Sequence, residues 1–284
     1  MTEPILKKYP AEIFGKPYTD NSAATKRSRN KQHCPFLDAE CKKPRKSEPH
    51  IKVGLFSVGY KGNASENYLP VIICPHRLDT QVIFRAVQAN CFAILGKDEK
   101  IVWASEVSIP QAGSADYVLA KTKNDEVVDF VCVELQAAGT TGTPWEAFLE
   151  HKRTGKFSKD SYNFGINWAN EFAKTMMQQA YKKGTLVQFW KKKIVFAIQD
   201  VGLDYLHATY DTSDLHPALD SDPIHFYTFK MIWNDATSAW QLHLAERLST
   251  NAEGVRKILA GTTSSKFPSV DEFVERIKRK LLTT

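Results

Sequence analysis

One short segment carries the side chains whose types and spacing could perform metal-assisted chemistry. In residues 131–136, Val-Cys-Val-Glu-Leu-Gln, apolar positions alternate in the pattern of a half-buried β-strand. Glu134 and Gln136 share one face of such a strand, because strand side chains alternate with a period of two. Asp116 begins an earlier strand-like segment and could reach the same space if the two strands pair near those ends.

These two carboxylates and the amide oxygen would form a hard-oxygen site suited to Mg²⁺. A metal held there lowers the pKa of a bound water, steadies a scissile phosphate and stabilises the leaving oxygen. The spacing alone is weak support, because many strands end in acidic residues that bind nothing. Taken by themselves, the residue types favour an ordinary polar strand end. Support for a metal site must therefore come from the surrounding sequence.

The elements around this segment alternate between strands and helices. Strands are expected over residues 101–109, 116–120, 127–136, 193–198 and 224–233, with a polar hairpin turn at 121–126. Helices are expected over residues 167–183, where Gly184 would end the helix, over 251–260, and after the capping box Ser269-x-x-Glu272. This order predicts an α/β fold, with a mixed central sheet flanked by helices.

The composition is that of a globular chain. Of its 284 residues 43% are hydrophobic and 25% are charged, which allows a substantial core and lacks the bias of a disordered chain. The apolar runs are too short to span a bilayer, and the first ten residues lack the apolar stretch of a secretory signal. We therefore expect a cytoplasmic protein with no membrane partner.

Positive charge is concentrated near the start of the chain. Residues 1–50 hold eleven Lys and Arg against six Asp and Glu, and so carry about five of the six net positive charges. Clustered cations suit contacts with phosphate groups, although a solvated arm explains them equally well. Lys152, Arg153 and Lys156 follow the candidate strand and are better placed to touch a nucleic-acid backbone.

Four of the five cysteines fall within residues 34–95. Their number and spacing are not those of a small disulfide scaffold, so metal ligation or simple burial is the better interpretation. We expect three parts in the chain: a basic, irregular arm over residues 1–33, a small cysteine-rich metal-binding module over 34–95, and the main domain over 96–284.

Longer stretches around the candidate site resemble a known family. Residues 113–119 (GSADYVL), 133–137 (VELQA) and 140–142 (TTG) look like the catalytic hairpin of the NotI/EagI family of Type II restriction endonucleases. That family is a variant of the PD-(D/E)XK nucleases in which Gln replaces the usual Lys. The resemblance implies a PD-(D/E)XK nuclease core in which Asp116, Glu134 and Gln136 are catalytic and Asp116 and Glu134 hold Mg²⁺. It adds Glu106 as a further catalytic member.

The N-terminal cysteines resemble the metal module of the same family, which holds one structural Zn or Fe ion with four thiolates. Cys34, Cys41 and Cys74 match three of these positions, and Phe56 occupies the place of the fourth. Cys91 is the best spare thiol to complete the set. The imidazole alternatives are His33, His50 and His76. The other interpretation is a module without an ion, in which Phe56 fills the space that the ion would occupy.

The resemblance implies a homodimeric, Mg²⁺-dependent enzyme that hydrolyses double-stranded DNA at a palindrome. Two-fold protein symmetry matches two-fold sequence symmetry, and the relatives favour GC-rich targets, so a site with a GGCC core is expected. Gln136 would position the attacking water or an outer-shell water, and Glu106 would complete the metal shell. Two alternatives stay open: a repair or defence nuclease without a fixed palindrome, and a metal-stapled DNA-binding protein whose nuclease site is inactive.

Overall fold

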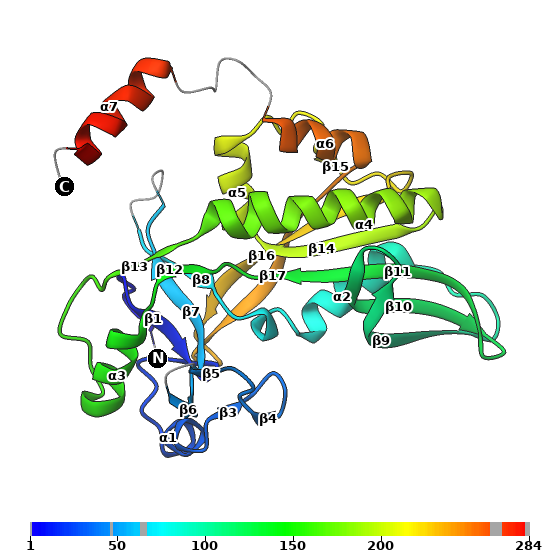
Figure 1. Cartoon of the computed structure of the whole chain (residues 1–284). Coiled ribbons are helices and arrows are strands. Elements are labelled where there is room, and N and C mark those ends of the chain that lie inside the picture. The colour runs from blue at the N-terminus through cyan, green and yellow to red at the C-terminus, as the bar shows by residue number, and fades with distance from the viewer. Residues whose placement is uncertain (1, 46–47, 63–66, 262–268, 282–284) are drawn as a thin grey trace.

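Figure 1 shows a mixed α/β fold built on two main sheets. The computed structural model describes residues 2–45, 48–62, 67–261 and 269–281. The strands of the larger sheet are β9 (Glu99–Ile109), β10 (Gly113–Lys123), β11 (Glu126–Gln136), β14 (Lys193–Gln199), β15 (His216–Pro217), β16 (Ile224–Asn234) and β17 (Ala239–Thr250). The strands of the smaller sheet are β1 (Pro10–Ile13), β2 (Lys16–Pro17), β7 (Leu55–Tyr60) and β8 (Leu69–Ile72).

Helices and short strand pairs complete the described part of the chain. The paired short strands are β3 (His33–Cys34) with β4 (Ala39–Glu40), β5 (Pro44–Arg45) with β6 (Glu48–Lys52), and β12 (Thr140–Gly142) with β13 (Phe164–Ile166). The helices are α1 (Ala23–Asn30), η1 (Pro75–Arg77), α2 (Gln81–Cys91), α3 (Trp145–Thr154), η2 (Ala169–Met176), α4 (Met177–Phe189), α5 (Asp200–Thr209), α6 (Ala252–Ala260) and α7 (Val270–Leu281). Among these helices η1 is of the 3₁₀ type and η2 of the π type.

The larger sheet has the strand order β15-β17-β16-β14-β11-β10-β9. Its centre is parallel, since β14 pairs in parallel with both β11 and β16, and antiparallel hairpins extend it on each side. The β10–β11 turn places Asn124 and Asp125 at φ 50° and 64°, a left-handed conformation that Asn and Asp tolerate. The predicted mixed sheet and the hairpin that carries Asp116 and Glu134 are therefore confirmed.

The larger sheet separates two layers of core. Cys132 of β11 and Phe196 of β14 pack in one cluster with residues of α4, α5 and α6. Val131 and Val133 of β11 face the other way and pack with residues of α2. This alternation confirms that Val133 and Glu134 point to opposite faces, so Glu134 lies on the face covered by α4 (Figure 1).

The prediction that a helix ends at Gly184 was wrong. A π-helix, η2, runs into α4, which continues through Gly184 to Phe189. A Cβ atom at Gly184 would lie 2.3 Å from Cδ1 of Ile224 in β16. Glycine is therefore present because α4 packs directly against the sheet there, and the helix tolerates the modest cost of glycine in its interior.

The expectation of an irregular segment over residues 1–33 was also wrong for part of that range. Strand β1 is buried at every position and pairs with β7 of the smaller sheet. Helix α1 begins after Ser22, whose hydroxyl accepts a hydrogen bond from the Thr25 N–H. A four-residue strand is too short to show a period, and its partner lies far along the sequence, so local patterns did not reveal it.

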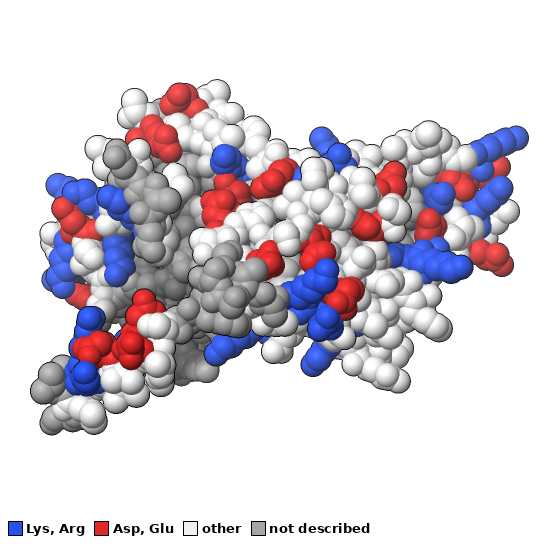
Figure 2. All heavy atoms as spheres, turned by 90° about the horizontal axis from the view of Figure 1, so that it is seen from above, with Lys and Arg blue, Asp and Glu red and all other residues white. Residues whose placement is uncertain are grey.

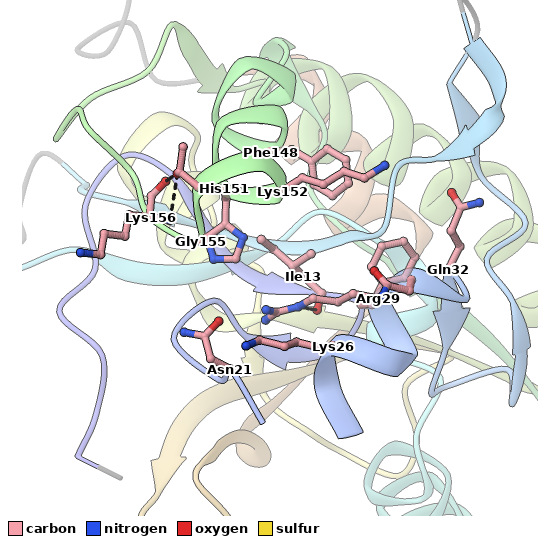
Figure 3. Close-up of a pocket in the computed structure, with 13 residues that line it drawn as sticks. Ile13, Asn21, Lys26, Arg29, Gln32, Phe148, His151, Lys152, Gly155 and Lys156 are labelled. Atoms are coloured by element: carbon pink, nitrogen blue, oxygen red, sulfur yellow. Dashed lines mark hydrogen bonds between the residues drawn. The ribbon is translucent and has the colours of Figure 1, made fainter. Parts of the chain in front are cut away.

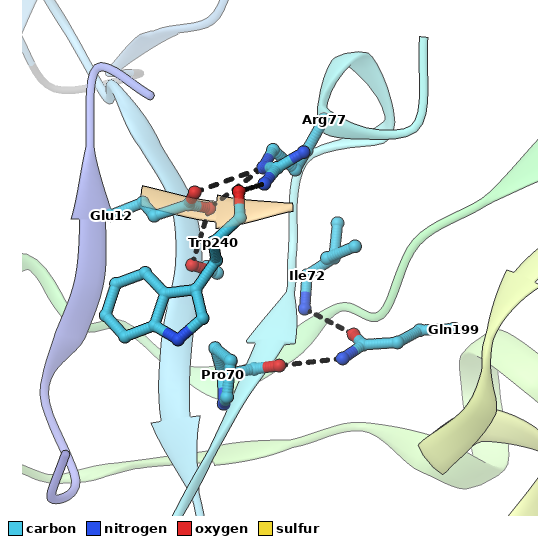
Figure 4. Close-up of polar contacts among 7 residues, drawn as sticks. Glu12, Pro70, Ile72, Arg77, Gln199 and Trp240 are labelled. Carbon is cyan, nitrogen blue, oxygen red and sulfur yellow. Dashed lines mark hydrogen bonds and ion pairs between the residues drawn. The ribbon is translucent and has the colours of Figure 1, made fainter. Parts of the chain in front are cut away.

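A buried polar network ties the smaller sheet to the larger one (Figure 4). Arg77 Nε lies 3.0 Å from Glu12 Oε2 on β1, and its Nη2 donates to the Trp240 carbonyl oxygen on β17 at 2.8 Å. The Ser57 hydroxyl donates to the same carboxylate at 2.8 Å. One core cluster also contains residues of both sheets, so the N-terminal region packs as part of one body with the main domain.

A second polar clamp joins the same two regions. The Gln199 side chain, at the end of β14, accepts a hydrogen bond from the Ile72 N–H and donates to the Pro70 carbonyl oxygen (Figure 4). The amide is buried, so both of its polar ends are satisfied by the backbone of β8.

The two predicted C-terminal helices are confirmed with their caps. The Asn251 side chain accepts from the Gly254 N–H, and Gly261 ends α6 at φ 64°. In α7, Ser269 and Glu272 exchange hydrogen bonds between side chain and backbone, as a capping box does. Within the described ranges, no helix is long and apolar enough to cross a membrane.

Candidate active site

The four predicted site residues meet in one cleft. The cleft has a volume of ≈ 890 Å³ and opens where β9, β10 and β11 end beside α4. Glu106, Asp116, Glu134 and Gln136 all line it, one from β9, one from β10 and two from β11. The antiparallel pairing of neighbouring strands brings the start of β10 beside the ends of β9 and β11, and so gathers these side chains.

The carboxylates of Asp116 and Glu134 are held by different means. Asp116 is exposed, and its Oδ2 accepts a hydrogen bond of 2.8 Å from the Leu135 N–H of the neighbouring strand. Glu134 is only 6% exposed. Burial raises the pKa of Glu134 to about 7, the Lys183 ammonium opposes the rise, and the nearby charge of Asp116 adds to it.

Lys183 of α4 is a cleft residue that sequence reasoning missed. Its Nζ lies 2.7 Å from Glu134 Oε1 and donates to the Ser114 carbonyl oxygen at 2.8 Å and to Gln179 Oε1 at 3.0 Å. A signal did exist, because Lys183 continues the buried helical stripe of Phe172, Met176 and Ala180. Because the helix was predicted to end at Gly184, Lys183 was not recognised as part of this stripe.

Glu106 has an unusual backbone. It adopts φ 52° in the middle of β9, between the pairs Ser105–Tyr117 and Val107–Ala115, so it stands across from Asp116 without pairing regularly. A non-glycine residue in this region costs about 1 kcal/mol or more, and such strain gathers at functional sites. The exposed Glu106 side chain is thereby redirected at the edge of the cleft.

Gln136 and Asp79 add polar groups to the same cleft. The Gln136 amide nitrogen donates to the Ala137 carbonyl oxygen at 2.8 Å, which leaves the amide oxygen as the ligating end. Asp79, absent from the predicted set, accepts a hydrogen bond of 2.7 Å from the Tyr117 hydroxyl. Burial, this bond and the charges of Asp116 and Glu106 raise the pKa of Tyr117, so it stays a neutral donor.

This donor set fits a magnesium ion that shares its shell with substrate and water. In the described ranges, no group of three or more His, Cys, Asp or Glu is placed so that it could hold a metal ion by itself. Mg²⁺ rarely needs one, since it commonly binds one or two carboxylates and keeps waters or phosphate oxygens as its other ligands. Glu134 lines the cleft, and its Oε1 is buried against the Lys183 ammonium at 2.7 Å, in a contact that lacks hydrogen-bond geometry.

The cysteines do not assemble as predicted. Cys34, Cys41 and Cys74 are buried in one core cluster, but Cys91 belongs to the other, with its Sγ 3.8 Å from the Tyr227 hydroxyl. The imidazole alternatives do not complete a metal group with these thiols in the described ranges: His33 is paired with Asp38, His50 is exposed, and His76 lines the cleft. The four-ligand site of Cys34, Cys41, Cys74 and Cys91 is therefore not formed within the described residues.

Aromatic packing fills the neighbourhood of the three clustered thiols. Phe56 is 1% exposed, and its ring centroid lies 5.1 Å from that of Phe36. Burial raises the pKa of Cys34 and raises that of Cys74 to about 11, although backbone N–H groups oppose both shifts. Packed rings in the same core cluster as the three thiols match a module held by its own packing.

A second cavity, of ≈ 650 Å³, lies between α1 and α3 (Figure 3). Lys26 and Arg29 of α1 face Lys152 of α3 and Lys156 just beyond it, and no Asp or Glu is among the described residues that line the cavity. Arg29 donates to three backbone carbonyl oxygens, so it is partly structural. The cavity joins basic residues from the first fifty positions with basic residues that follow β11 in the sequence. We name these four residues the basic cavity.

Comparison with known proteins identifies a family over most of the chain. The family model described as restriction endonuclease NotI matches residues 18–231, a span that contains every residue of the cleft. Curated proteins give no match.

Proposed function

Because this chain belongs to the NotI restriction endonuclease family and is thus a site-specific deoxyribonuclease, we propose that it cuts double-stranded DNA with Mg²⁺ held in the cleft. The observation that carries the proposal is the convergence of Glu106, Asp116, Glu134 and Gln136 from three strands onto that one cleft. Strand pairing alone does not require four acidic or amide side chains to lie together. A site that binds a cation and a phosphate does require such a group.

Each residue has a role that follows from its position. Asp116 and Glu134 would hold the metal, which supplies charge neutralisation at the scissile phosphate when bound. Asp116 is preorganised by the Leu135 N–H, so its second oxygen points away from the backbone contact. Gln136, whose nitrogen is engaged with the backbone, presents an oxygen that can orient the attacking water. Glu106 stands opposite and would complete the shell through water.

The test is digestion of plasmid and phage DNA with and without Mg²⁺. Discrete fragments, with sequencing of their ends, support the proposal and give the site, which we expect to be a GC-rich palindrome with a GGCC core. Asp116→Ala and Glu134→Ala should abolish cutting, whereas Glu126→Ala, exposed at the far end of β11, should cut normally. Equal cutting by all three variants would refute the site. Random smearing of DNA by the wild type would favour a nuclease without a fixed palindrome. DNA binding by the wild type without cleavage would favour an inactive site.

The basic cavity is the proposed contact for DNA phosphates outside the cut site. Seen from above in Figure 2, Lys and Arg are interspersed with Asp and Glu among the described residues, so that face has no broad positive field. The basic cavity instead groups cations without an acid in its described lining. Lys26→Ala with Lys152→Ala should flatten the dependence of log affinity on log salt by about 0.9 for each lost phosphate contact. Lys230→Ala, on β16, is the control.

We propose a homodimer in the bacterial cytoplasm, because a palindrome presents the same half-site twice. Exposed apolar residues on α7 support self-association: Val270, Phe273, Ile277 and Leu281 are between 44% and 72% exposed. Light scattering should give twice the 32.1 kDa mass, and Phe273→Glu with Ile277→Glu tests the contribution of this helix. A structural Zn or Fe ion is left out of the proposal, and metal analysis that finds either ion, abolished by Cys34→Ser, would restore it.

A further inference from the structure

Lys183 is a buried cation beside the proposed metal ligands. It is 4% exposed, although it lines the cleft. Its ammonium donates to the Ser114 carbonyl oxygen and to Gln179 Oε1, and it forms an ion pair of 2.7 Å with Glu134 Oε1. A lysine is costly to bury and is rarely found buried without such partners. The groups around Lys183 therefore determine its position.

The fold places Lys183 with little freedom. Gln179 lies one helical turn before it on α4, and the two side chains meet on the same face of the helix. The next residue, Gly184, lets α4 rest directly on Ile224 of the sheet. The Ser114 contact reaches the strand that carries Asp116, two residues before it. Lys183 therefore links the helix to both strands that bear the metal ligands.

The cleft needs a positive charge that its catalytic strand does not supply. Four acidic residues line it, namely Asp79, Glu106, Asp116 and Glu134. Gln136, at the end of β11, is neutral and cannot donate as a cation. Of the lysines that line the cleft, Lys183 is the one whose ion pair with a cleft carboxylate is formed within the described residues.

We propose that Lys183 is a positioning residue for the reaction, which fixes the Glu134 carboxylate toward the cleft and supplies from α4 the positive charge that β11 lacks at Gln136. This inference rests on the proposed nuclease function. Lys183 acts through Glu134: two hydrogen bonds and the ion pair hold its ammonium in place, so it prepares the ligand before metal and DNA arrive. The preorganised carboxylate then binds a cation without first reorienting.

The experiment compares Lys183→Met, Lys183→Arg and the control Lys174→Met, whose lysine is exposed on η2 outside the cleft. Single-turnover cleavage at saturating Mg²⁺, Mn²⁺ binding by calorimetry without DNA, and thermal unfolding are measured on each purified protein. We expect Lys183→Met to slow cleavage by about 100-fold and to weaken Mn²⁺ binding about tenfold. Lys183→Arg should recover most of both, and Lys174→Met should match the wild type.

Gln179→Leu guards against a variant that fails to fold. It removes one acceptor of Lys183 but keeps the ion pair, so we expect a loss of cleavage and Mn²⁺ affinity smaller than that of Lys183→Met. If Lys183→Met lowers only the unfolding temperature and leaves both readouts at wild-type values, the lysine is merely structural and the inference fails. A wild type that cuts DNA beside an equally active Lys183→Met refutes the inference alone, whereas a wild type that never cuts refutes the proposed function.

Discussion

Two buried pairs of opposite charge lie in different surroundings in this molecule. Glu12 and Arg77 are closed in: the carboxylate accepts from Ser57 and Arg77, and the guanidinium also donates to the Trp240 carbonyl oxygen (Figure 4). Glu134 and Lys183 are equally buried but line an open cleft, beside a second acid, Asp116. The closed pair joins two sheets, while the open pair retains an oxygen, Glu134 Oε1, without a well-directed hydrogen bond in the described chain.

The difference shows how to separate structure from function in buried charges. Burial and ion pairing are common to both pairs, so neither distinguishes them. What distinguishes them is where the remaining hydrogen-bonding capacity goes. Protein groups use it up at Glu12, whereas Glu134 lines a cleft large enough for a metal and a phosphate.

The largest contrast should appear when each glutamate is made neutral. Glu134→Gln removes a proposed metal ligand, and we expect single-turnover cleavage to fall by about 1,000-fold, as expected when strong electrostatic stabilisation is lost. Glu12→Gln leaves the cleft intact, so cleavage by the folded fraction should match the wild type. Rates are measured at low temperature on protein whose folded fraction is known by circular dichroism. Equal losses in both variants would remove the distinction between the pairs.

The elements of the open pair show how far the sequence could predict this site. The strands that carry Asp116 and Glu134 were predictable because the period of two is local and the hairpin turn is short. Lys183 was not, since its partner lies on a strand far away in sequence and only the packing of α4 on the sheet brings them together. Asp79 was missed for the same reason, because its contact with Tyr117 is tertiary.

The Glu12–Arg77 pair shows how far the structure of the N-terminal region could be predicted from the sequence. Resemblance drew attention to Cys74 and the following residues as a metal module, and the structure gives Arg77 a packing role instead. The replacement of a cysteine by Phe56 was visible in the sequence, and so was the alternative that this ring fills the space. Sequence could not choose between them, because the choice depends on whether four side chains converge in space.

A smaller effect is expected from removal of one partner of the closed pair. Arg77→Met leaves the Glu12 carboxylate buried with only Ser57 as a partner, and we expect the free energy of unfolding to fall by about 3–5 kcal/mol. Urea unfolding measures it, with Arg256→Met on α6, an exposed ion pair, as the control. That control should lose about 0–1 kcal/mol. A comparably small loss for Arg77→Met would mean that solvent reaches the Glu12 network.

The smallest expected effect is a dependence of the unfolding free energy on pH, which should distinguish the two pairs. The pKa of Glu134 is raised by burial from 4.5 to about 7, so its ionisation in the folded state opposes folding. The stability linked to its neutral form is complete below pH 4.5, declines as pH rises and is lost above about pH 7. The full difference corresponds to about 3 kcal/mol. Wild type and Glu134→Gln should therefore unfold alike near pH 4.5, and the variant should become the more stable protein by pH 8 without metal.

Magnesium should reverse this difference, since a cation beside Glu134 stabilises its charged form. Added Mg²⁺ at pH 8 should raise the unfolding free energy of the wild type and leave that of Glu134→Gln unchanged. Glu12→Gln is the matched control, because its stability loss should not respond to Mg²⁺. A difference between wild type and Glu134→Gln that is constant from pH 4.5 to 8 would mean that the Lys183 ammonium compensates fully for burial. In energetic terms, the Glu134–Lys183 pair would then behave like the enclosed Glu12–Arg77 pair.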